Sequence, residues 1–134
     1  MSFTSNEVLL APCVPISWGE LIDKICILEI KKQRASNEAV RKNIVAEFRL
    51  LNSFVSEEIL GYPDLMGLWA QVKDINLKIW DIEDEIRLKE ASCDFGERFI
   101  KLARNTYKLN DRRASIKREI NNILNSEIIE EKIY

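Results

Sequence analysis

ISWGELIDKICILEIKKQR, residues 16–34, is the stretch of this sequence that decides the fold. Ser17 and Glu20 have the spacing of a capping box, in which a hydroxyl and a carboxylate satisfy amides at the start of a helix. Apolar residues then occupy two sides of the expected helix: Trp18, Leu21, Ile22, Ile25 and Leu28 on one side, and Cys26, Ile27 and Ile30 on the other. A helix that is apolar on two sides is usually surrounded by others, so we expect a central helix here.

Three further helices are expected in the rest of the chain. Residues 38–60 carry an apolar stripe, with Asn37 as a cap before it and Gly61 as a natural stop after it. Residues 65–91 and 95–125 carry two longer stripes. Asp64 is the expected N-cap of the first, and Asp94 with Glu97 is the expected capping box of the second. Since only residues 92–94 separate them, these helices should form an antiparallel hairpin about 40 Å long.

The expected fold is therefore all-α, a four-helix up-down bundle that contains the long antiparallel hairpin of residues 65–91 and 95–125. Residues 1–15 should form an extended N-terminal arm, because Pro12 and Pro15 exclude a helix there. Residues 16–134 should form a single helical domain. For the short C-terminal tail, residues 126–134, two alternatives stay open: it pairs with the arm, or it extends the last helix.

The composition excludes several classes of function. With 20 basic and 22 acidic residues among 134, the net charge is −2, so no strong field attracts nucleic acid or a membrane surface. The sequence contains no histidine, which excludes Ser-His-Asp and Cys-His catalysis. No apolar run approaches the ~20 residues that cross a bilayer. We expect a protein that binds neither nucleic acid nor a membrane.

The three cysteines, Cys13, Cys26 and Cys93, are widely spaced and form no CxxC pair. A disulfide framework or a zinc site is therefore not indicated, and we expect three free thiols in a reducing, cytoplasmic compartment. We expect no metal, no cofactor and no catalytic residue that the sequence can identify.

Polar residues inside the apolar stripes are the candidates for function. In a hairpin centred near Cys93, Glu83 should face Asn105 and Asn76 should face Arg113. Buried charges need partners, so these two polar layers should be either a structural network that fixes helix register or the lining of a pocket. The network is the favoured interpretation.

In the pocket interpretation, an anionic small molecule lies between the helices and a bidentate guanidinium holds it. The candidate ligand-binding residues are Lys24, Glu83, Asn110 and Arg113. Charge is also segregated, acidic over residues 81–90 and basic over residues 98–118. We interpret these runs as solvated helix faces rather than as a phosphate-binding or RNA-binding surface, or as a magnesium site at Asp81, Asp84 and Glu85.

Four motifs resemble those of a family of small, uncharacterised bacterial proteins, a domain of unknown function. They are ISWGELIDKI at residues 16–25, WDIED at 80–84, NDRRA at 110–114 and EEKIY at 130–134. The resemblance covers nearly the whole chain from about Val14. It implies a bacterial source and a compact, all-helical fold, and it implies no activity, cofactor or site, because none of the motifs is a known catalytic signature.

Two functions stay open. The first is a non-enzymatic helical interaction module that forms a homodimer or binds a protein partner, which surplus apolar surface at residues such as Leu50 and Phe54 would serve. The second is a small-molecule-binding protein or an enzyme, in which Arg, Lys and Glu could act electrostatically. A pocket that contains Glu83 and Arg113 would favour the second, and a filled bundle with an apolar outer patch would favour the first.

Overall fold

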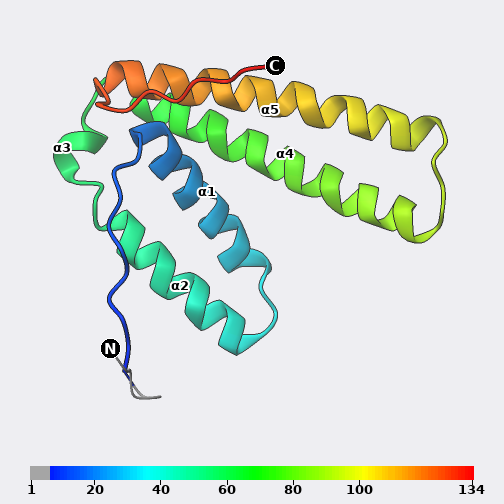
Figure 1. Cartoon of the computed structure of the whole chain (residues 1–134), viewed down its shortest axis with the longest axis horizontal. Helices are drawn as coiled ribbons and strands as arrows, with labels where there is room; N and C mark the ends of the chain where they lie inside the picture. Colours follow the sequence, from blue (N-terminus) through cyan, green and yellow to red (C-terminus); the bar gives the residue numbers. More distant parts are fainter. Residues whose placement is uncertain (1–6) are drawn as a thin grey trace.

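The computed structural model describes residues 7–134, and this part of the chain contains helices and no strand. The five helices are α1 (Trp18–Arg34), α2 (Glu38–Asn52), α3 (Glu57–Leu60), α4 (Leu65–Ala91) and α5 (Glu97–Ile123) (Figure 1). The prediction of an all-α fold is thus confirmed. Residues 1–6 of the predicted arm lie outside the described residues. Within residues 7–134, no helix combines the length and the apolarity needed to span a membrane.

Helix α1 is central, as its two apolar sides predict. Ile22 and Cys26 are fully buried in the core that α1 forms with α4 and α5. Leu21, Ile25 and Leu28 are buried too, on the side of α1 that faces α2. Lys32 continues that side by one turn, and its Nζ lies 5.3 Å from the ring centroid of Phe48 in α2. Both apolar sides of the helix therefore have a neighbour.

The predicted four-helix bundle is wrong, because α2 does not join the core. Helices α1, α4 and α5 contact one another, whereas the extensive contacts of α2 are with α1 alone. Figure 1 shows α2 on the far side of α1 from the α4–α5 pair. One neighbouring helix cannot cover an amphipathic helix completely, and α2 contains no buried residue. The fold is a three-helix core with a fourth helix attached to its outside.

The single helix predicted over residues 38–60 is also wrong, because the chain breaks between α2 and α3. Two serines compete with the helical backbone at the break. Ser53 donates from its hydroxyl to the Leu50 carbonyl at 2.6 Å, and Ser56 accepts from the Ile59 amide at 3.3 Å as the N-cap of α3. The apolar stripe alone did not reveal this second start signal.

Two of the predicted caps differ from those observed. Asp64 precedes α4 in a left-handed conformation with φ 66°, and its side chain makes no capping hydrogen bond. Asp94 does not cap α5, which begins at Glu97 with Gly96 as its N-cap. Its carboxylate instead accepts from the Gly96 amide at 3.2 Å and the Lys89 ammonium at 3.1 Å, so it fixes the turn between α4 and α5.

The C-terminal tail does not extend α5, and it forms no strand pairing with residues 7–15, the described part of the arm. It is an extended segment that turns back beside α5, as Figure 1 shows. Glu131 pairs with Arg118 at 2.9 Å, and Lys132 pairs with Asp111 at 2.6 Å. The start of the tail is tied to α1, because Ser126 Oγ accepts from the Trp18 amide at 3.3 Å.

Candidate functional site

The most elaborate polar arrangement lies where α1, α4 and α5 meet, directly beside the apolar core. We call it the polar cluster, and its members are Glu20, Asp23, Asn76, Asn110, Arg113 and Lys117. Helix α1 supplies the two carboxylates, α4 supplies one amide, and α5 supplies the other amide and both cations. The negative charges of the cluster therefore all come from α1 and the positive charges all come from α5.

A continuous chain of hydrogen bonds crosses the cluster. Asn76 donates from Nδ2 to Asp23 Oδ1 at 2.7 Å and accepts at Oδ1 from Arg113 Nη1 at 2.7 Å. Arg113 also donates from Nη2 to Asn110 Oδ1 at 2.7 Å. Asp23 and Asn76 are buried and cannot bind bulk water, so these bonds satisfy their polar atoms. The chain links α1 to α5 through α4.

Lys117 joins the two carboxylates of α1. Its ammonium donates to Glu20 at 2.6 Å and to Asp23 at 3.1 Å. Burial alone would raise the pKa of Glu20, but the hydrogen bond and the charge of Lys117 hold that pKa below its ordinary value. Burial alone would likewise lower the pKa of Lys117, and the same two carboxylates keep it above its ordinary value. Glu20 and Lys117 therefore form an ion pair that favours the charged form of both groups.

The close approach of α1 to α5 depends on Gly19. Its amide donates to Asn121 Oδ1 at 2.7 Å. A Cβ atom at this position would lie 2.6 Å from the Lys117 carbonyl oxygen, which is closer than real Cβ atoms come to any heavy atom. The glycine in the ISWGELIDKI motif thus allows Lys117 to reach the carboxylates of Glu20, the next residue, and of Asp23, one turn further along α1.

The structure brings together some of the predicted site residues. Asn110 and Arg113 belong to the cluster, and the predicted Asn76–Arg113 layer is present. Lys24 lies at the edge, exposed, with its ammonium 3.6 Å from Glu20. Whether any of these residues binds a ligand stays a prediction.

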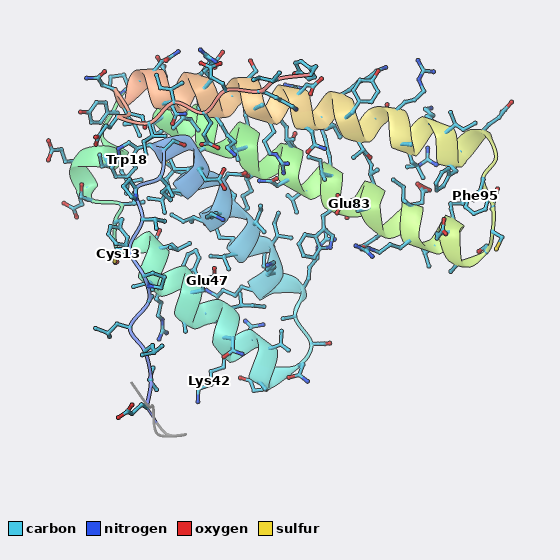
Figure 2. The ribbon with its side chains drawn as sticks, viewed as in Figure 1. Cys13, Trp18, Lys42, Glu47, Glu83 and Phe95 are labelled. Carbon is cyan, nitrogen blue, oxygen red and sulfur yellow. The ribbon has the colours of Figure 1, made fainter. Side chains whose placement is uncertain are left out.

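The predicted Glu83–Asn105 layer is wrong. Glu83 is exposed on α4 and makes no hydrogen bond or ion pair with any described residue (Figure 2). Helix α1 ends at this level, where Arg34 pairs with Asp81 at 2.9 Å. No third helix covers this part of the α4–α5 pair, so a charged residue here needs no buried partner.

Sequence analysis missed Glu20, Asp23 and Lys117. Asp23 carried a usable signal, because it lies on the same side of α1 as Cys26 and Ile30, at i+3 and i+7. Lys117 lies one turn beyond Arg113, so it could have been assigned to the same face of α5. For Glu20, its spacing from Ser17 predicts only a role in a capping box. The Ser17 hydroxyl does accept a hydrogen bond from the Glu20 amide. The Glu20 carboxylate, however, binds the Lys117 ammonium and not a backbone amide at the start of the helix.

A groove of about 480 Å³ lies between α5 and the C-terminal tail, and we call it the tail groove. Its lining includes cluster residues of α5 and three charged residues of the tail: Asn110, Arg113, Ala114, Lys117, Arg118, Asn121, Glu130, Glu131 and Lys132. Glu130 accepts a hydrogen bond from the Ser17 hydroxyl across the groove's end. The polar cluster therefore borders a space that small molecules could occupy.

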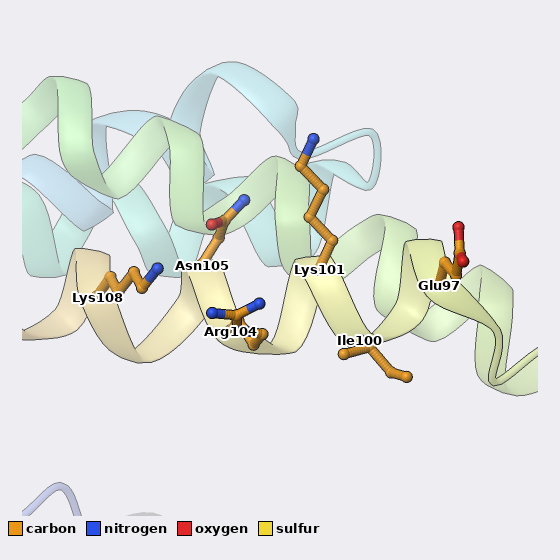
Figure 3. Close-up of a pocket in the computed structure, with 6 residues that line it drawn as sticks. All are labelled: Glu97, Ile100, Lys101, Arg104, Asn105 and Lys108. Carbon is orange, nitrogen blue, oxygen red and sulfur yellow. The ribbon is translucent and has the colours of Figure 1, made fainter.

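A second hollow, of about 440 Å³, lies on the part of α5 that projects beyond α1 (Figure 3). All of its lining residues come from this one helix: Glu97, Ile100, Lys101, Arg104, Asn105 and Lys108. No second element converges on it, so it presents a row of basic side chains and not an enclosed site.

Three acidic residues in and directly after the WDIED motif, Asp81, Asp84 and Glu85, form ion pairs. Asp81 and Asp84 lie 2.9 Å and 3.9 Å from the Arg34 guanidinium, and Glu85 accepts three hydrogen bonds from Arg98. Among the described residues, no group of three or more Cys, Asp or Glu side chains is arranged to hold a metal ion.

Comparison with known families assigns the class of the chain. Residues 13–134 match DUF6165, a family of unknown function. The chain belongs to this family, which covers all five helices and the tail. No curated protein and no solved structure was found to be similar to it.

Proposed function

We propose that this protein is a non-enzymatic helical interaction module that works by self-association, and that α2 and the N-terminal arm form the contact surface. The observation that carries this proposal is that α2 is amphipathic and yet contains no buried residue. An amphipathic helix normally buries its apolar stripe against neighbours. A second copy of the chain would supply a second neighbour for α2, in addition to α1.

The apolar residues on this side of the molecule are well exposed. Val40, Leu50 and Phe54, on α2 and just after it, are 50%, 53% and 59% exposed. In the arm, Val8 and Leu10 are 91% and 94% exposed, so they have almost no contact with their own chain. Clusters of large apolar side chains in water are typical of protein–protein contacts.

The total exposed area supports a partner of substantial size. The chain exposes 9763 Å². A compact monomer of 15.6 kDa should expose about 7,300 Å², so the excess is about 2,500 Å². Permanent homodimers bury roughly 1,000–2,500 Å² per subunit. The projecting α4–α5 pair and the extended arm account for part of this excess.

The polar cluster supports a structural role beside this surface. Among the described residues, no buried side-chain nitrogen or oxygen lacks a hydrogen-bond partner. A fully satisfied network fixes the register of α1 against α4 and α5. A rigid core of this kind would present α2 and the arm in a defined orientation.

Light scattering at micromolar concentration tests the proposal. The parent should have about twice the 15.6 kDa chain mass, and Leu50→Glu with Phe54→Glu should reduce it to the mass of one chain. Ile100→Glu is the matched control, since Ile100 is 54% exposed on the projecting part of α5. A parent that stays monomeric, or a control that dissociates the dimer equally, would refute the proposed surface.

We also propose that the protein works in a reducing, cytoplasmic setting. All three cysteines are free, and two of them, Cys13 and Cys93, are exposed. Exposed thiols persist where the surroundings are reducing. Purification without reductant should produce mixed disulfides at these two positions, whereas an intramolecular disulfide would contradict the proposal.

A further inference from the structure

We propose that the tail groove is a binding site for a small oxyanion, a phosphate or carboxylate group, and that Arg113 is its principal ligand. This inference is independent of the proposed self-association, which uses the opposite side of α1. It rests on how the cations of the groove are paired, on the way Arg113 is held, and on the chemistry of the tail that covers it.

Three of the four cations that line the groove already contact a carboxylate. Lys117 binds Glu20 and Asp23, Arg118 binds Glu131, and Lys132 binds Asp111. Arg113 is different. Both of its hydrogen bonds go to neutral amide oxygens, those of Asn76 and Asn110. Its full positive charge is therefore the one in this groove that no carboxylate touches.

The same two bonds make Arg113 a preorganised ligand. A guanidinium has five N–H donors, and the bonds to Asn76 and Asn110 use two of them, one on each terminal nitrogen. The remaining donors keep the planar arrangement that matches the two oxygens of a carboxylate or phosphate group. Because Arg113 is half-buried and already ordered, an anion would not have to immobilise a mobile side chain.

The surroundings supply further donors. The Lys117 ammonium has three protons, and its two carboxylate partners use two of them. Asn110, whose carboxamide has two N–H donors, and Lys132 also line the groove. At about 480 Å³ the groove lies within the ordinary size range of small-molecule sites.

The tail of the chain acts as a competing acidic cover. Glu130 and Glu131 bring two negative charges to the groove, one bound to Ser17 and the other to Arg118. The Arg118–Glu131 and Lys132–Asp111 pairs are solvent-exposed, and exposed pairs contribute little to stability. An oxyanion that approaches Arg113 therefore meets electrostatic repulsion from Glu130 and Glu131.

Isothermal titration calorimetry at low ionic strength tests the site, with inorganic phosphate and citrate as separate probes. At least one probe should bind the parent. Arg113→Met should weaken binding by about tenfold or more, the effect of one charged hydrogen bond. Arg112→Met is the matched control, because it removes the same charge from the neighbouring exposed residue, which does not line the groove. Its affinity should stay close to that of the parent.

A second variant keeps the test decisive if Arg113→Met fails to fold. Glu130→Gln with Glu131→Gln removes both negative charges of the cover at exposed positions, so the fold should persist and the affinity should rise several-fold. Binding of phosphate alone or citrate alone would identify the preferred oxyanion, and both results support the site. Absence of binding in the parent and in the double variant would overturn it. Equal losses in Arg112→Met and Arg113→Met, or an unchanged affinity in the double variant, would overturn it as well.

Discussion

Asn76 lies between Asp23 and Arg113 and bridges two opposite charges that do not contact each other directly. Its Nδ2 group donates to the carboxylate, and its Oδ1 atom accepts from the guanidinium, each at 2.7 Å. The carboxamide carries a donor and an acceptor on the same planar group, so it can serve both partners at once. Asn76 therefore connects α1 to α5 from its position on α4.

Replacing Asn76 with leucine should lower the free energy of unfolding by about 1–3 kcal/mol, because Asp23 loses a donor and Arg113 loses an acceptor in a buried place. Urea unfolding measures the change. Gln71→Leu, at an exposed position of the same helix, should stay within about 0.5 kcal/mol of the parent. Equal effects of the two substitutions would mean that the bridge contributes nothing to stability.

The sequence predicted this layer because Asn76 and Arg113 interrupt apolar stripes on two helices joined by a short turn. The partner on α1 was missed, since a hairpin register relates only the two helices of the hairpin. Gly19 determines how closely α1 packs against that hairpin. This close contact between α1 and α5 cannot be recognised from the spacing of apolar residues in the sequence. The same reasoning that succeeded at Asn76 failed at Glu83, because it presumed that helices cover the hairpin along its full length.

Gly19→Ala should destabilise the protein by about 1–3 kcal/mol, because its Cβ would collide with the Lys117 carbonyl of α5. Gly67→Ala is the matched control. No atom lies within 4 Å of the Cβ that it would add, and alanine is the better helix former, so it should stabilise α4 by about 0.5–1 kcal/mol. The melting temperature should therefore fall in Gly19→Ala and rise in Gly67→Ala. A stabilised Gly19→Ala variant would contradict the close approach of α1 to α5.

The sequence also predicted the ends of α1 and α4 well, since each has a distinct apolar stripe and a clear stop. It predicted the position of α2 in the fold poorly. A stripe such as Ile44, Phe48 and Leu51 shows that a helix face is apolar, and it does not show whether one helix or two will cover that face. The half-buried state of these residues is the outcome of an arrangement that local pattern cannot determine.

The ion pairs of Lys117 should make stability depend on pH in a defined way. The pKa of Glu20 in the folded protein lies below the ordinary value of 4.5. The contribution of Glu20 to the free energy of unfolding is therefore present above pH 4.5 and is lost as the pH falls through the lower pKa of the folded state. Lys117→Met removes the partner and should cost about 2–4 kcal/mol at pH 7. Unfolding measured from pH 7 to pH 3 should show the difference between parent and variant shrinking below about pH 4.5. A difference that stays constant with pH would argue against the pairing.

The three cysteines should differ sharply in reactivity. Burial, followed by the charges of Glu29 and Asp23, raises the pKa of Cys26 to about 12, whereas Cys13 and Cys93 are exposed. Since the thiolate is the reactive form, a thiol reagent at pH 8 should modify two cysteines of the native protein quickly. Cys26 should react only at the rate at which the core opens. In denaturant, all three cysteines should be modified. Fast modification of all three in the native protein would mean that α1 is not held against α4 and α5 as described.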